Sequence, residues 1–276
     1  MAAILLTLSL ISFILFLAPL DFKKYFAAFG WLFLGIFFVG TSALYLAENE
    51  FVYPFIALLS LPVLIITIKN CLYEDKTALQ ITTVASIAFL IYSVIAFIDP
   101  FSEWMIASQV ENTVLALTAI GHPASVSTWD TILSNGYIII ITISCTPIVG
   151  TAVMLGLAAG VDGTRQQKLL AFLFVILSLA LLNIVRLIFV VVAYSEQWFP
   201  YFLDLASNGY PGYESFYWAH NVIGRISFTL LGIVVVGGGL IVFIPAIKQF
   251  YSDILYFYYR GLKKMADSFL RIFKSD

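Results

Sequence analysis

Long apolar runs separated by short polar segments dominate this chain, and the placement of its basic residues constrains the fold most. Twelve of its 14 Lys and Arg lie between the runs or in the C-terminal tail, whereas Arg186 and Arg225 interrupt apolar runs. Hydrophobic residues make up 62% of the 276 residues and charged residues only 11%. This composition is typical of a polytopic helical membrane protein. We therefore expect an all-α membrane protein.

Seven apolar runs are close to or above the roughly 20 helical residues that a bilayer crossing requires. They cover residues 3–20, 25–47, 51–69, 78–98, 137–160, 169–194 and 219–247. The first run lacks the basic start and the cleavage site of a signal peptide, so we interpret it as a retained span. The run 104–121 contains Gln109, Glu111 and Asn112, which predicts an amphipathic helix on the outer surface. The basic, aromatic tail 248–276 predicts a helix lying on the inner leaflet.

The basic residues also predict the orientation in the cell membrane. Lys and Arg occur in alternate connections and in the tail, whereas the connections 48–50, 99–136 and 195–218 contain none. Segments rich in Lys and Arg stay in the cytoplasm. The C-terminus is therefore expected to be cytoplasmic and the N-terminus to lie outside.

Four polar or reactive groups fall in the outer half of three predicted spans: Cys145, Arg186, His220 and Arg225. Each Arg costs about 2.5–3.5 kcal/mol at mid-bilayer on insertion scales, so such residues usually line a polar cavity. At 1.5 Å per residue, Arg186 lies roughly 12 Å from the outer end of its helix. The orientation thus predicts a cavity that opens to the outer face.

These residue types suit acyl transfer through a thioester. A neighbouring cation lowers the pKa of a thiol, an Arg can hold an oxyanion, and a His can carry a proton. Asn183 and Asn221 are the polar side chains available to support them. Cys71, in a predicted cytoplasmic connection, is interpreted as a small hydrophobe. No Cys pair has metal-ligand spacing, so no metal or cofactor is expected, and the dispersed basic residues indicate no nucleic-acid partner.

Three short motifs carry a family resemblance. The stretches ISCTPIVG around Cys145, LNIVRLIF around Arg186 and AHNVIGRISF around His220 and Arg225 resemble the exosortase/archaeosortase family, most closely its archaeosortase A group. The resemblance covers residues 100–247, while the earlier spans match only in hydrophobic character. It implies a catalytic core in 101–247, a supporting N-terminal part in 1–100 and a cytoplasmic tail.

The resemblance implies a membrane-embedded cysteine transpeptidase. Cys145 would be the nucleophile and Arg186 the stabiliser of the oxyanion or thiolate, with Arg225 favoured over His220 as the third family position. His220 and Arg225 are five residues apart, so in an α-helix their side chains point about 140° away from each other. Which of the two carries the proton therefore stays open. The implied substrates are C-terminal sorting tails of secreted, S-layer-type surface proteins, with a Pro-Gly-Phe motif. The implied acyl acceptor is a membrane lipid.

The connection 195–218 is rich in aromatic residues, and we expect Tyr217 and Trp218, together with Asn183 and Asn221, to contact substrate. An interfacial aromatic belt explains the same composition equally well. Two other functions stay open. An anion-binding transporter would use Arg186 and Arg225, although the inner halves of their helices are apolar. A non-catalytic assembly protein would leave Cys145 dispensable. The signatures of rhomboid-like serine proteases and of HExxH metalloproteases are absent from the sequence.

Overall fold

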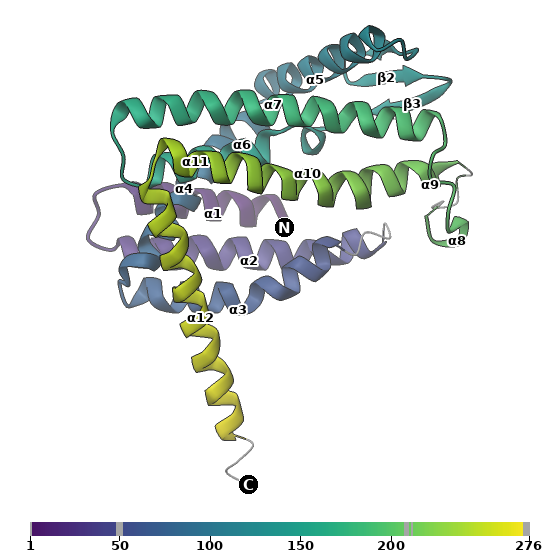
Figure 1. The fold of residues 1–276 in the computed structure, drawn as a ribbon. Helices are drawn as coiled ribbons and strands as arrows, with labels where there is room; N and C mark the ends of the chain where they lie inside the picture. The colour runs from purple at the N-terminus through teal and green to yellow at the C-terminus, as the bar shows by residue number, and fades with distance from the viewer. Residues whose placement is uncertain (1, 48–51, 207–209, 211, 273–276) are drawn as a thin grey trace. The chain divides into compact units, whose positions relative to one another are not determined.

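The protein is largely helical, as expected for a multi-pass membrane protein (Figure 1). The computed structural model describes residues 2–47, 52–206, 210 and 212–272. Within these residues, five helices are long and apolar enough to cross a membrane: Lys23–Leu46, Tyr53–Leu72, Lys76–Ala96, Arg165–Ser195 and Tyr213–Phe243. Two further apolar helices, Ala2–Leu17 and Ile148–Gly160, are shorter. The first coincides with the predicted span 3–20, whereas the second covers only the last 13 residues of the predicted span 137–160. The predicted connection 48–50 lies outside the described residues.

The chain forms two compact units. Unit 1 comprises Met1–Leu90, Ala159–Gly163 and Ile244–Asp276. Its helices are α1 (Ala2–Leu17), α2 (Lys23–Ala47), α3 (Val52–Leu72), most of α4 (Lys76–Ala96) and α12 (Ala246–Ile272). Lys24 Nζ lies 2.8 Å from Glu74 Oε1. This ion pair joins the first turn of α2 to the α3–α4 connection, so the predicted basic segments around Lys24 and Glu74 lie at the same end of unit 1.

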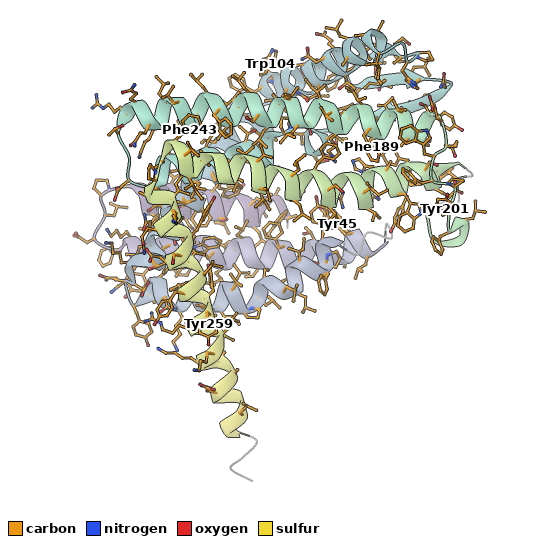
Figure 2. All side chains as sticks on the ribbon, in the orientation of Figure 1. Tyr45, Trp104, Phe189, Tyr201, Phe243 and Tyr259 are labelled. Carbon is orange, nitrogen blue, oxygen red and sulfur yellow. The ribbon has the colours of Figure 1, made fainter. Side chains whose placement is uncertain are left out.

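The predicted tail helix is present as α12 and packs on α3. The Tyr258 and Thr67 hydroxyls are 2.8 Å apart, and Gly261 lies so close to Ile66 that a Cβ there would be 2.8 Å from its methyl carbons. Tyr259, which follows Tyr258 and is labelled in Figure 2, is 65% exposed. The helix therefore has one packed face and one open aromatic face.

Unit 2 comprises Ile91–Ala158 and Thr164–Phe243. Its elements, in chain order, are α5 (Asp99–Ala119), β1 (Ser125–Thr128), β2 (Thr131–Ser134), β3 (Tyr137–Ile140), the 3₁₀ turn η1 (Ile143–Cys145), α6 (Ile148–Gly160), α7 (Arg165–Ser195), α8 (Leu203–Ala206), α9 (Tyr213–Phe216), η2 (Tyr217–Gly224), α10 (Arg225–Gly232), η3 (Ile233–Gly237) and α11 (Gly238–Phe243).

A three-stranded antiparallel sheet, in the order β1-β2-β3, replaces the first part of the helix predicted over 137–160. Asn135 and Gly136 connect β2 to β3 and both have positive φ, 48° and 82°. An Asn-Gly pair is the preferred two-residue hairpin loop, and the following run of isoleucines favours a strand. The prediction of one continuous helix through Cys145 was therefore wrong.

The sheet, α5 and α7 share a buried apolar cluster: Ile106, Val110, Leu117, Ile132, Ile139, Ile141, Cys145, Leu187 and Val191. The helix predicted over 104–121 is confirmed as α5, but it is not simply a surface helix. Trp104, which is labelled in Figure 2, is 65% exposed. Gln109 on the same helix is only 5% exposed. The interpretation of Gln109 as a surface residue was wrong, because this face of α5 packs on α7.

The spanning helix Tyr213–Phe243 is irregular in two places. Residues Tyr217–Gly224 and Ile233–Gly237 are π-helical, and the helix continues to Phe243. The predicted span 219–247 therefore begins six residues earlier, at Tyr213, and ends before Pro245. α7 lies alongside it (Figure 1). Thr164 caps α7 in a reciprocal capping box with Gln167, which explains why this helix begins at Arg165.

Candidate active site

The main chain around Cys145 is locked into a short turn. Cys145 ends η1, and Pro147 directly precedes α6. The Cys145 N–H donates to Thr142 O at 2.9 Å, and the Thr146 N–H donates to Ile143 O at 3.1 Å. Pro147 has no N–H, and the Ile148 N–H points at Thr146 Oγ1 at 3.4 Å. The four residues from Cys145 onward therefore offer no unengaged main-chain donor beside the thiol.

The Cys145 side chain is 8% exposed and contacts His220. Its Sγ lies 3.9 Å from His220 Nε2 and 3.6 Å from Thr142 Oγ1. Because Cys145 lies in the turn η1 and not within a spanning helix, its predicted position in the outer half of a helix over 137–160 was wrong. The predicted proximity of Cys145 and His220, which are 75 residues apart in sequence, is present in the structure.

The His220 ring is held on two sides. Its Nδ1 lies 2.6 Å from Asn221 Oδ1. Because an amide oxygen only accepts, Nδ1 carries the hydrogen and Nε2 presents either a lone pair or a second hydrogen to the thiol. Phe216 stacks on the ring, with centroids 4.9 Å apart and planes at 9°. Asn221 and Phe216 thus fix the tautomer and the plane of the imidazole.

Arg186 shares the same imidazole nitrogen. Its Nη2 lies 3.3 Å from His220 Nε2. A guanidinium can only donate, so this contact is a hydrogen bond when Nε2 has its lone pair. Once Nε2 takes a proton, the two cations repel each other. Proton transfer from Cys145 to His220 therefore weakens this contact and favours interaction of Arg186 with a nearby anion.

The thiol is acidic in this setting. Burial raises the pKa of Cys145, but the hydrogen bond and the charge of His220, with smaller contributions from Thr142, outweigh burial and bring the pKa down to about 6. An unperturbed Cys has a pKa near 8.5 and is only a few per cent thiolate at pH 7. A pKa of about 6 makes Cys145 mostly thiolate at that pH.

The Asn183 side chain bonds the main chain of Cys145. Its Nδ2 donates to Cys145 O and to Gln109 Oε1, both at 2.9 Å, and its side chain is 7% exposed. Its amide hydrogens therefore face protein acceptors, although we predicted a contact with substrate. Asn221, the other predicted substrate contact, instead holds His220.

The remaining predicted site residues, Tyr217, Trp218 and Arg225, lie on the same helix as His220. Arg225 is the first residue of α10, five residues after His220. The i→i+5 hydrogen bonds of the π-helix bring residues five apart close to one turn, whereas an α-helix would separate them by about 140°. Tyr217 is buried, and the Trp218 indole donates from Nε1 to Tyr201 O at 3.0 Å. Figure 2 places Tyr201 next to α8.

Sequence reasoning missed three neighbours of the site: Gln109, Thr142 and Phe216. Phe216 precedes His220 by one helical turn, so its stacking was accessible from spacing once the start of the helix was placed correctly. Gln109 and Thr142 act through tertiary contacts, for which the sequence carries no local signal.

The arrangement combines an acidic thiol, an oriented imidazole and an arginine, which are the groups that nucleophilic catalysis at a carbonyl requires. Among the described residues, no group of three or more His, Cys, Asp or Glu could hold a metal ion. Comparisons with protein-family models, with curated proteins and with solved structures found no match.

Proposed function

We propose that this protein is a membrane-embedded cysteine transpeptidase, similar to the archaeosortase A group, that cleaves the C-terminal sorting tails of exported surface proteins. The observation that supports the proposal most strongly is the contact of the Cys145 thiol with an imidazole held by Asn221 and Phe216 and shared with Arg186. The geometry is that of a cysteine nucleophile with its base and the residue that orients the base.

In the first half-reaction, Cys145 Sγ attacks the carbonyl carbon of the scissile peptide bond. His220 holds the thiol proton on Nε2 and passes it to the departing amine when the C–N bond breaks. The products are a thioester on Cys145 and a released C-terminal peptide with a neutral amino group. His220 is left neutral and ready to act as a base.

The charge on the tetrahedral intermediate needs a donor, and the main chain does not supply one near Cys145. The N–H groups of Cys145, Thr146 and Ile148 are engaged, and Pro147 has none. Arg186 is a cationic donor that contacts the same imidazole nitrogen as the thiol, which supports its role as the oxyanion stabiliser. The thiol, His220 and Arg186 then have separate tasks, so His220 rather than Arg225 is our candidate proton carrier.

In the second half-reaction, a hydroxyl or amine of a membrane lipid attacks the thioester. His220 Nε2 accepts the proton of this nucleophile, the new ester or amide bond forms, and Cys145 leaves as the thiolate. A lipid acceptor is consistent with a site carried by apolar spanning helices. The proposal includes the orientation derived from the basic residues, with seven spans, the N-terminus outside and the site on the extracytoplasmic side.

The decisive experiment uses Cys145→Ala and Cys145→Ser beside the wild type, with a reporter that ends in a Pro-Gly-Phe tail. Loss of the reporter's C-terminal segment is followed on a gel. Cys71→Ala is the matched control, because Cys71 is also a buried free cysteine but belongs to unit 1. We expect the wild type and Cys71→Ala to process the reporter, and the two Cys145 variants to leave it intact. Processing by Cys145→Ala would refute the proposed nucleophile.

Two alternatives predict different results in the same experiment. An assembly protein without catalytic activity leaves the reporter tail intact in every variant, including the wild type. An anion transporter would use the charge of Arg186 without Cys145, and it too would leave the reporter tail intact in every variant. In the structure, Arg186 contacts the imidazole that also contacts the Cys145 thiol.

A further inference from the structure

A buried hydrogen-bonded chain links α5, α7 and the carbonyl of the proposed nucleophile. Asn183 Nδ2 donates one hydrogen to Cys145 O and the other to Gln109 Oε1, each over 2.9 Å. Asn183 is 7% exposed and Gln109 is 5% exposed. No other described residue makes a hydrogen bond to Cys145 O. The position of this carbonyl is therefore set by one side chain.

The direction of the Asn183 amide is set by Cys145 O. An amide has a donor end and an acceptor end of nearly the same shape, so packing alone does not select between them. Cys145 O is a main-chain carbonyl that can only accept, so it selects the NH₂ end of Asn183. Gln109 presents its Oε1 to the second hydrogen of the same NH₂ group. Gln109 thus restrains the Asn183 side chain from α5 while Asn183 bonds Cys145 O.

Helix α7 provides both Asn183, which bonds Cys145 O, and Arg186. Asn183 and Arg186 are three residues apart on α7, a spacing that places two side chains side by side on a helix. Cys145 lies in a single 3₁₀ turn whose main-chain hydrogen bonds engage the N–H groups of Cys145 and Thr146 but leave Cys145 O to Asn183. The distance between the thiol and its partners therefore depends on the link to Asn183.

We infer that Gln109 and Asn183 form a positioning pair that fixes the main chain of Cys145 and thereby holds the thiol against His220 and Arg186. Neither side chain takes part in bond making. The inference rests on the proposed function for its meaning in catalysis, but the positioning itself is a property of the protein without substrate. Active sites commonly need such support, because small displacements of the reacting groups lower the rate.

The chain offers a matched control on the same helix. Thr113 lies four residues after Gln109 on α5, is fully buried, and its Oγ1 has no hydrogen-bond partner among the described residues. Thr113→Val therefore perturbs the packing of α5 on the same buried side without touching the positioning pair.

The test measures the pH dependence of Cys145 alkylation by iodoacetamide in the full-length membrane protein, on a Cys71→Ala background. The variants are Gln109→Met, Asn183→Leu, the double variant and Thr113→Val. We expect the alkylation midpoint of Gln109→Met and Asn183→Leu to rise by about one pH unit or more toward that of an ordinary thiol. The double variant should shift no further than Asn183→Leu, since both changes break one unit. Thr113→Val should keep the wild-type midpoint.

The inference is overturned if the Gln109→Met midpoint equals that of Thr113→Val. If Asn183→Leu fails to fold, Gln109→Met decides alone, because it leaves Asn183 in place. Processing of the Pro-Gly-Phe reporter is measured in parallel. A wild type that leaves this reporter intact counts against the proposed function, while the alkylation midpoints still decide whether the pair positions the thiol.

Discussion

Gly224 allows the close packing of the π-helical turn that carries His220, so Gly224→Ala should disable the site. A Cβ at this position would lie 2.5 Å from the carbonyl oxygen of Ala219 and 3.5 Å from Val190 Cγ2. Ordinary contacts begin near 3.4 Å, so the Ala219 peptide must move by about 0.9 Å. Ala219 directly precedes His220, and the movement is therefore transmitted to the imidazole.

The consequence for the rate follows from the contact that His220 makes. The distance from Nε2 to Cys145 Sγ is already 3.9 Å, which leaves little room for a displacement of this size. A misplacement of about 1 Å typically costs a factor of about 10², equivalent to about 2.7 kcal/mol in the barrier. We expect reporter processing by Gly224→Ala to fall by this factor and the alkylation midpoint of Cys145 to rise.

The assay compares initial rates of reporter processing, normalised to the amount of folded protein in the membrane. Gly232→Ala is the control, because Gly232 ends α10 and a Cβ there meets only Leu179 Cδ2 at 3.7 Å, an ordinary contact. Gly232→Ala should match the wild type. A Gly224→Ala protein with wild-type rate and midpoint would refute the claim that the geometry of this turn sets the position of His220.

Further expectations concern single groups in and near the site. Alkylation of Cys145 should reach half its maximal rate near pH 6 and rise with pH, because the reactive thiolate forms as the proton leaves; a midpoint near 8.5 would contradict the lowered pKa. Arg186→Met should lower the rate of reporter processing by about 10² to 10³ if the guanidinium binds the oxyanion, and a loss below tenfold would remove that role. Asn221→Leu removes the acceptor at Nδ1 of His220 and should slow processing about tenfold, whereas Asn221→Asp, which keeps an acceptor, should recover most of the rate. His122 bonds two serine hydroxyls at 2.9 and 3.1 Å, so His122→Phe should destabilise the sheet by about 1–3 kcal/mol and expose the 123–136 hairpin to limited proteolysis; unchanged cleavage would show that the packing alone holds it.

Apolar periodicity and length were sufficient to predict the long helices. α7 was predicted over 169–194 and covers Arg165–Ser195, extended by the Thr164 cap. The β-hairpin was missed because the isoleucine run 138–141 is as apolar as a spanning helix. Only the Asn-Gly pair before it distinguishes the two structures, and the length of the combined run concealed this signal.

The candidate site was predictable to the extent that its residues have unusual chemistry. An arginine or a histidine within an apolar run is visible in a sequence, and the structure brings Arg186 and His220 to Cys145. Gln109 looked like a surface residue because a single polar side chain on a helix cannot reveal which face meets a neighbour. The π-helical turn was also unpredictable, since its cause is a register change that leaves composition untouched.

The wide sequence separation between the thiol and its imidazole has a consequence for synthesis of the protein. His220 follows Cys145 by 75 residues, which a ribosome adds in about 4–15 s at 5–20 residues per second. During that interval His220 has not yet been added, and His122 precedes Cys145 but bonds Ser134 and Ser195 in the folded protein, so Cys145 keeps the low reactivity of an ordinary cysteine. Nucleophilic power appears only when the helix Tyr213–Phe243 has joined α7. A chain whose synthesis stops before His220 therefore has a Cys145 thiol of ordinary, low reactivity.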